Sequence, residues 1–326
     1  MNVFRVLAAV AAALMLVVAP PSAHAQSWPS KPIRIIVPAA PGGVSDFIGR
    51  MVAQPLSEVL GQSVIVDNRP GASGLLGTEI AAAATPDGYT LLMFADTNSI
   101  FPSTVKSMRH DPVKSFTPIT ILGRGAFVLV AHPSLPVNNL QELIRYAKQH
   151  PGEKMSYASP GAGSPMHLGF ELIKASSGID IVHIPYKGGG QAILNLVGGQ
   201  VKVGIIGMAP ALPHIKAAKI KALAVTGGTR SKVLPDVPTV AESGLPGFAI
   251  AQWQGIVAPA GTSSVVIARV HDELLKIMRQ PAVAEKLESI GMDTTTSATP
   301  EDFARFVQDE VKRWPAVARA AGVTPE

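Results

Sequence analysis

Two glycine-rich segments that open helices carry the strongest chemical signal in this sequence. The first is Ala40 to Asp46 in "PAAPGGVSD" and the second is Ser159 to His167 in "SPGAGSPMH". Both follow a short apolar run and precede an apolar-striped helical pattern. Glycines in such a strand-to-helix connection let backbone N–H groups face a bound ligand, and the helix dipole adds positive potential there. The pair indicates an anion site, although tight turns between strands and helices commonly contain glycine without any ligand.

Polar side chains within these two segments admit two interpretations each. Ser45, Asp46 and Ser164 can cap the first N–H groups of a helix, or they can contact a ligand. His167 lies in the first turn of its helix, where the dipole should lower the imidazole pKa and favour a neutral hydrogen-bonding ring. A lone histidine is more often structural, so both roles stay open for it.

The sequence lacks the familiar catalytic and cofactor motifs. No G-x-S-x-G nucleophile elbow occurs, and "GAGSPM" places Met166 where a dinucleotide fingerprint requires glycine. "YKGGG", which begins at Tyr186, reverses the order of a phosphate loop, so Lys187 is either an anion contact or a solvated lysine. The histidines lack metal-binding spacing and the chain has no cysteine. The sequence therefore predicts no metal and no cofactor.

The composition of the 326-residue chain points to an exported protein. Residues 1–25 combine Arg5, an apolar run and a terminal "AHA", which is the pattern of a cleaved secretory signal peptide. Loss of Arg5 alone would lower the formal charge from +5 to +4. Lysine and arginine are scattered and only 5% of residues are aromatic, so a nucleic-acid surface is not expected.

Short apolar runs alternate with helical patterns from end to end of the mature chain. The alternation predicts an α/β fold with mainly parallel sheets, and the length predicts two domains. The predicted strands are 33–37, 63–67, 89–94, 127–131, 155–158, 181–184, 201–206, 221–225 and 254–258. The clearest predicted helices are 44–60, 73–84, 138–149, 165–177, 189–197, 263–279 and 300–320. Asn138 or Asn139 and Thr299 are the expected helix caps.

A series of motifs along the chain carries a specific resemblance. "PIRIIVPAAPGG.SD", "VDNRPGASG..G", "ATPDGYTLL", "YASPGAGSPMHL", "HIPYKGGGQA", "PDVPTVAESGLPGF" and "WQGIVAPAGT" follow one another in order. The chain thereby resembles the solute-binding receptors of tripartite tricarboxylate transporters, the Bug family. The resemblance implies a type II periplasmic-binding (Venus flytrap) fold: domain 1 from 26–124 and 253–326, domain 2 from 125–252, and crossings near 125 and 252. We expect Trp253 to be a hydrophobic anchor near the second crossing, with a wall of the ligand cleft as the less favoured alternative.

The same resemblance implies that backbone N–H groups of the two glycine segments hold a ligand carboxylate without an arginine clamp. Asp96, Thr97 and Asn98 look like a third contributor, and the "YKGGG" loop a fourth. Relatives that bind amino acids carry an acidic group near the position of Ile206, so the apolar residue here predicts a ligand without an amine. The expected ligand-binding residues are Ala40, Gly42, Gly43, Ser45, Asp46, Thr97, Asn98, Ser159, Gly161, Gly163, Ser164, His167 and Ile206.

The resemblance implies a non-enzymatic, monomeric receptor in the periplasm that captures a small carboxylate and delivers it to a membrane permease. A receptor that signals to a sensor protein is an alternative that the sequence cannot separate from transport. An α/β hydrolase with Ser164 or Ser45 as nucleophile and His167 as base is disfavoured, because the nucleophile elbow is missing.

Overall fold

The structure, a computed structural model, describes residues 28–325. Within the chain, Lys31–Glu326 forms one compact unit, and the description below concerns that unit. The predicted signal peptide, 1–25, lies outside the described residues. No helix among residues 28–325 is long and apolar enough to cross a membrane.

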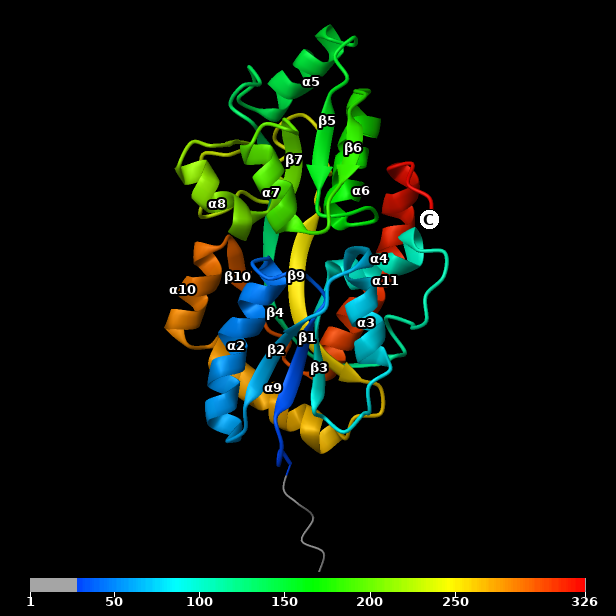
Figure 1. The fold of residues 1–326 in the computed structure, drawn as a ribbon, viewed down its shortest axis with the longest axis vertical. Coiled ribbons are helices and arrows are strands. Elements are labelled where there is room, and N and C mark those ends of the chain that lie inside the picture. Colours follow the sequence, from blue (N-terminus) through cyan, green and yellow to red (C-terminus); the bar gives the residue numbers. More distant parts are fainter. Residues whose placement is uncertain (1–27, 326) are drawn as a thin grey trace, which may run out of the picture. The chain divides into compact units, whose positions relative to one another are not determined.

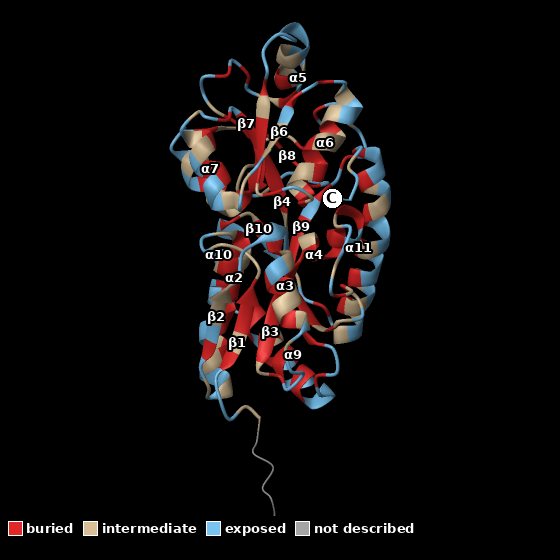
Figure 2. Ribbon diagram, turned by 45° about the vertical axis from the view of Figure 1, so that its right-hand side comes forward, coloured by how far each residue is buried: buried red, intermediate tan, exposed pale blue. Residues whose placement is uncertain are grey.

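Ten strands form one sheet within the described residues, in the order β2-β1-β3-β9-β4-β7-β5-β6, with β10 and β8 also paired to β4. The strands are β1 Ile33–Val37, β2 Val64–Asn68, β3 Thr90–Ala95, β4 Phe116–Ala131, β5 Ser156–Ser159, β6 Val182–Pro185, β7 Val203–Gly207, β8 Lys221–Val225, β9 Ala251–Pro259 and β10 Met292–Thr294. Helices cover the sheet, so its central strands are buried, while β2, β6 and β10 and the outer faces of the helices are partly or fully exposed (Figure 2).

The helices fill the connections between strands. They are α2 Val44–Leu60, the short 3-10 turn η1 Ala72–Gly74, α3 Leu75–Ala82, α4 Asp96–Thr104, α5 Leu140–Gln149, α6 Pro165–Ser177, α7 Gly189–Val197, α8 Met208–Lys216, α9 Ser264–Met278, α10 Pro281–Ser289 and α11 Pro300–Ala320. Asn139 caps α5 and Thr299 caps α11 in a capping box, as the sequence predicts.

Two long strands join two halves of the sheet. Residues 116–126 of β4 pair with β9, whereas residues 127–131 pair with β7 and 128–131 also with β8. We call β1, β2, β3, β9, β10 and 116–126 of β4, with their helices, the β1 half; β5 to β8 and 127–131 of β4 are the β5 half (Figure 1). The partner change in β4 and the start of β9 lie near the crossings expected at 125 and 252. The division into domains stays a prediction.

The α/β class is confirmed, but the expectation of mainly parallel sheets is wrong. Within the described residues, β1 pairs in parallel with β2 and β3, and β5 pairs in parallel with β6 and β7. The remaining five pairings are antiparallel, and all involve β4 or β9. The physical reason is topological: β4 leaves the β1 half and β9 returns to it, so these strands must run in opposite directions.

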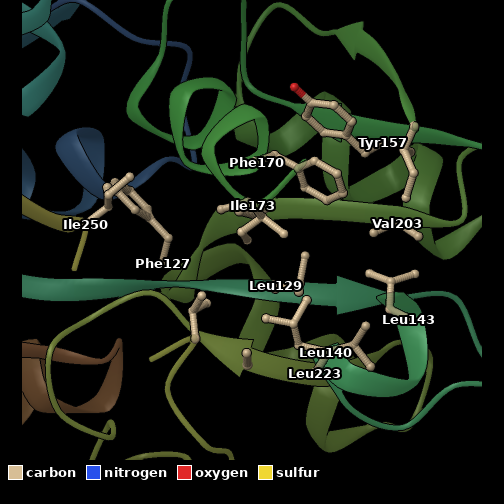
Figure 3. Packing of buried hydrophobic residues seen from close by; sticks show 14 of the residues in the cluster. Phe127, Leu129, Leu140, Leu143, Tyr157, Phe170, Ile173, Val203, Leu223 and Ile250 are labelled. Carbon is tan, nitrogen blue, oxygen red and sulfur yellow. The ribbon is translucent and has the colours of Figure 1, made fainter. Parts of the chain in front are cut away.

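Apolar side chains form cores in both halves, and the cluster of the β5 half also includes Ile100 of α4 and Trp314 of α11. In the β5 half, Tyr157 and Phe170 stack with ring centroids 3.8 Å apart, above Leu129 of β4 (Figure 3). In the β1 half, Trp253 is buried against Phe94 and Phe303, which confirms it as a hydrophobic anchor. Each half therefore has a substantial core of its own, which keeps the loops at its edge in place.

Candidate functional site

The first glycine segment is held by the buried carboxylate of Asp46. Asp46 Oδ2 accepts the Gly42 N–H at 3.0 Å, and Oδ1 accepts Arg50 Nε and Asn68 Nδ2, both at 3.0 Å. Burial would raise the pKa of Asp46, but the hydrogen bonds from Arg50, Gly42 and Asn68 outweigh that effect and hold the pKa below its usual value. Asp46 is therefore ionised and fully engaged at neutral pH.

This arrangement leaves the N-terminus of α2 open to an external acceptor. Gly43 is the N-cap residue, and it has no side chain with which to cap the helix. The first N–H groups of a helix have no partner inside the helix, and the dipole makes this end positive. Ser45 Oγ donates to Gln254 Oε1 at 2.9 Å, which ties the first turn to β9. Since Gly42 already donates to Asp46, the free donors begin at Gly43.

The second glycine segment is closed by its own hydrogen bonds. The hydroxyls of Ser159 and Ser164 both donate to the Gly161 carbonyl, at 3.0 and 2.7 Å. Ser164 Oγ also accepts the His167 N–H, and the Gly163 N–H donates to His167 Nδ1 at 3.1 Å. These contacts fix the shape of the loop and consume several of its backbone donors.

The two helix N-termini are therefore not equivalent. Ser164 is a side-chain cap for α6, and Pro165 at its first position has no N–H. At α2, Gly43 has no side chain that could cap the helix, and the first helical residue, Val44, keeps its N–H. The similar sequences of the two segments predict equivalent backbone donors at both helix starts, whereas the geometry leaves fewer donors available at α6 than at α2.

The imidazole of His167 rests on a second histidine. His167 and His183 stack with ring centroids 4.0 Å apart and an interplanar angle of 10°. His183 Nε2 lies 2.6 Å from Ser159 Oγ, and its other face stacks on Tyr157. Burial, and after it the electrostatic effects of His167 and Lys174, lowers the pKa of His183 to about 3. His183 is a neutral platform that fixes the ring of His167.

The glycine loops of the β5 half lie directly against the β1 half. A Cβ added at Gly188 would lie 3.8 Å from Ala40 Cβ, and one at Gly207 would lie 3.3 Å from Val44 Cγ2. The Gly188 N–H in turn donates to the Pro160 carbonyl at 2.9 Å. The "YKGGG" loop thus connects the second glycine segment to the first, and the two segments border one seam.

The remaining predicted residues have local partners. Asn98 is buried, accepts the Ala95 N–H and donates to Thr78, so its side chain is occupied. The Thr97 hydroxyl donates to Asp96. Ile206 has no exposed surface and packs in an apolar cluster with residues of β4, α7 and α8. Whether Thr97, Asn98 and Ile206 contact a ligand stays a prediction.

Sequence reasoning missed three residues that organise the site. Arg50 and Asn68 hold Asp46, and His183 supports His167. A signal for two of them was present, because Asn68 lies in "VDNRPGASG" and His183 in "HIPYKGGG", both motifs of the family resemblance. Their partners are distant in sequence, so spacing alone does not reveal the contacts.

Within residues 28–325, no group of three or more histidine, aspartate or glutamate side chains forms a metal site. A cavity of about 170 Å³ lies between β4, the loop 227–233 and β10. The ion pair of Lys232 and Asp293 spans its lining. None of the predicted ligand-binding residues lines this cavity.

The fold matches that of a solved relative described as periplasmic binding protein BugD, which is 34% identical, with a TM-score of 0.85 over 92% of this chain and 100% of that one. The family model described as "Tripartite tricarboxylate transporter family receptor" matches residues 48–323, and the chain belongs to this family of solute-binding receptors. Among curated proteins, it is 36% identical to Protein BugT of Bordetella pertussis over 324 residues, which cover 99% of each chain.

Two solved structures of relatives contain small dicarboxylates. The structure of R. palustris Rpa4515 with adipate is 33% identical, has a TM-score of 0.88, and matches 92% of this chain and 100% of that one. MatC from Rhodopseudomonas palustris with bound malate is 30% identical, has a TM-score of 0.81, and matches 89% of this chain and 99% of that one. Both ligands are carboxylates without an amine.

Proposed function

We propose that this receptor captures a small, amine-free organic carboxylate at the seam between the two halves. The observation that carries the proposal is the open N-terminus of α2, where Gly43 leaves the first N–H groups without a cap. Backbone donors at a positive helix end can hold a carboxylate without a buried counter-charge. The relatives with adipate and malate support the same ligand class.

The charges around the seam favour a ligand without an amine. Asp46, the acidic residue of the first segment, already accepts from Gly42, Arg50 and Asn68. A ligand ammonium would need a carboxylate that is free to pair with it, because an unpaired charge in a closed site is costly. The proposal therefore agrees with the expectation drawn from Ile206.

The site is proposed to bind and not to catalyse. A serine nucleophile needs a histidine nitrogen that accepts its hydroxyl proton. Ser164 instead donates its hydroxyl to the Gly161 carbonyl, and His167 Nδ1 accepts the Gly163 N–H. This pattern supports a loop that holds its shape over a hydrolytic pair.

We place the protein in the periplasm, exported by residues 1–25, with a tripartite transporter permease as its membrane partner. The two domains proposed are 26–124 with 253–326, and 125–252. The partner change of β4 after Ala126 supports this division, since β4 and β9 then act as the hinge strands. Closure of the halves would bring donors from both onto one ligand.

A ligand screen tests this function. Thermal unfolding is measured with adipate, malate and other amine-free mono- and dicarboxylates, and with aspartate and glutamate. A ligand at about 100 times its Kd stabilises the folded state by roughly 2.7 kcal/mol, which raises the Tm of a protein of this size by several degrees. We expect shifts with amine-free acids. Tight calorimetric binding of aspartate or glutamate, with no response to the others, contradicts the proposal.

A further inference from the structure

The turn that precedes α3 has an unusual backbone. Gly71, Ala72, Ser73 and Gly74 all have positive φ angles, of 136°, 45°, 55° and 102°. Glycine adopts such angles freely, but alanine and serine do so only at an energetic cost, because their Cβ crowds the following carbonyl oxygen. Backbone of this kind persists where the surroundings enforce it, and it is concentrated at ligand clamps and switch regions. The strained backbone at Ser73 therefore points to a specific role for this residue.

The strained turn points the hydroxyl of Ser73 across the seam. Ser73 Oγ donates to the carbonyl of Ala162, in the second glycine segment, at 2.8 Å. The turn itself is fixed to the β1 half, because a Cβ at Gly74 would lie 2.9 Å from the Pro38 carbonyl oxygen. The hydrogen bond therefore joins η1, which packs beside the residue that follows β1, to the loop that precedes α6.

Gly161, opposite this turn, leaves room for Ser73 because it has no side chain. A Cβ at Gly161 would lie 2.4 Å from Ser73 Oγ, so no larger residue fits there without a shift. Gly161 is not among the glycines with positive φ, so its backbone conformation does not demand glycine. The close approach of Ser73 instead explains why a glycine stands at position 161. Nearby, a Cβ at Gly163 would lie 2.9 Å from Thr104 of α4, also across the seam.

We propose that Ser73 is a latch residue: its hydroxyl, presented by the strained turn, bonds Ala162 across the seam and prolongs the closed form of the receptor. The inference rests on the proposed function, since closure around a ligand gives the latch its use. Ser73 positions the second glycine segment and does not itself contact the ligand. An exposed hydrogen bond of this kind has a modest net worth, which corresponds to about a fivefold change in an equilibrium.

The test measures closure directly. The chain has no cysteine, so Glu58→Cys on α2 and Lys148→Cys on α5, both exposed, accept spin labels without competing thiols. Electron–electron distance measurements give the ratio of closed to open molecules, with and without adipate, and stopped-flow mixing gives the dissociation rate of adipate. The test variant is Ser73→Ala. The matched control is Ser289→Ala, which removes an exposed hydroxyl that also bonds a backbone carbonyl, at 2.7 Å.

We expect Ser73→Ala to lower the closed-to-open ratio and raise adipate dissociation, each about fivefold, while Ser289→Ala changes neither. Gly161→Ala should lower the closed-to-open ratio more in the wild-type background than in a Ser73→Gly background, because the added Cβ clashes with the Ser73 hydroxyl. The latch proposal is overturned if Ser73→Ala leaves both the closed-to-open ratio and the dissociation rate of adipate unchanged. It is also overturned if Gly161→Ala lowers the closed-to-open ratio equally in both backgrounds. Failure of the whole acid screen on the wild type instead contradicts the proposed function, and the ligand-free distances still decide the latch.

Discussion

Replacement of Gly43 by aspartate should separate stability from ligand binding at the open end of α2. Gly43 has φ of −83°, and an added Cβ would meet only the Ala40 carbonyl oxygen, at 3.7 Å. A larger residue therefore fits without backbone strain. Aspartate is a favourable N-cap, since its carboxylate accepts first-turn N–H groups and complements the dipole. Gly43→Asp should raise the stability of the ligand-free protein by up to about 1 kcal/mol, of which the cap itself contributes a few tenths and the helix dipole the rest.

The same substitution places a negative charge where the ligand carboxylate is proposed to sit. Two unit charges about 4 Å apart repel by roughly 4 kcal/mol at an effective dielectric constant near 20. That repulsion corresponds to about a thousandfold loss of affinity. The Tm without ligand should thus rise by a few degrees while the shift produced by a carboxylate disappears, two changes of opposite sign in one variant.

Two further variants at the same position isolate the charge. Gly43→Asn provides a neutral cap of nearly equal shape, and Gly43→Ala provides neither cap nor charge. Titration calorimetry should give a far smaller loss of affinity for Gly43→Asn than for Gly43→Asp, and a smaller loss still for Gly43→Ala. If Gly43→Asp binds the acid as tightly as the wild type, the carboxylate does not sit at α2 and the reasoning is refuted.

Two other carboxylates give tests of stability and of loop order. Burial raises the pKa of Asp96 to about 7, so the folded state keeps a proton that the unfolded state loses near pH 3.8. Stability from this group is therefore lost as the pH rises between these values, by roughly 2 kcal/mol from pH 5 to pH 7. Asp96→Asn should remove this slope in urea unfolding; an unchanged slope would contradict the buried acid. Asp46→Asn leaves one acceptor oxygen for the donors of Gly42, Arg50 and Asn68, and we expect a loss of about 2 kcal/mol in unfolding free energy. It should also weaken carboxylate binding, and a variant with wild-type stability and affinity would show that Asp46 does not order the loop.

The elements with strong periodicity could be predicted from the sequence. The helices 44–60, 165–177, 189–197 and 300–320 agree with α2, α6, α7 and α11. Three helices were missed: α4 begins with the polar run "DTNS", α8 contains two prolines, and α10 buries only Val283 and Leu287. Residues 116–126 of β4 were missed because Pro118 and two glycines interrupt a strand whose register shifts twice. Proline, glycine and polar residues interrupt the local sequence patterns of these elements, which are stabilised by contacts with residues distant in the sequence.

The candidate site divides in the same way. Loop composition and helix starts identify the two glycine segments, because both signals are local. The contacts that shape them are not local: Asn68 lies 22 positions from Asp46, and Ser73 lies 89 positions from Ala162. Composition also could not reveal that Ser164 and Pro165 close the α6 end while Gly43 leaves α2 open. That asymmetry follows only from the folded geometry.

A crystal structure of the protein with an amine-free dicarboxylate, taken from the thermal screen, tests the central claim most directly. We predict one carboxylate within hydrogen-bond distance of the backbone N–H groups that begin at Gly43, with the β5 half closed over the ligand. A carboxylate held by an arginine or lysine side chain, or a ligand bound away from the start of α2, would contradict the account.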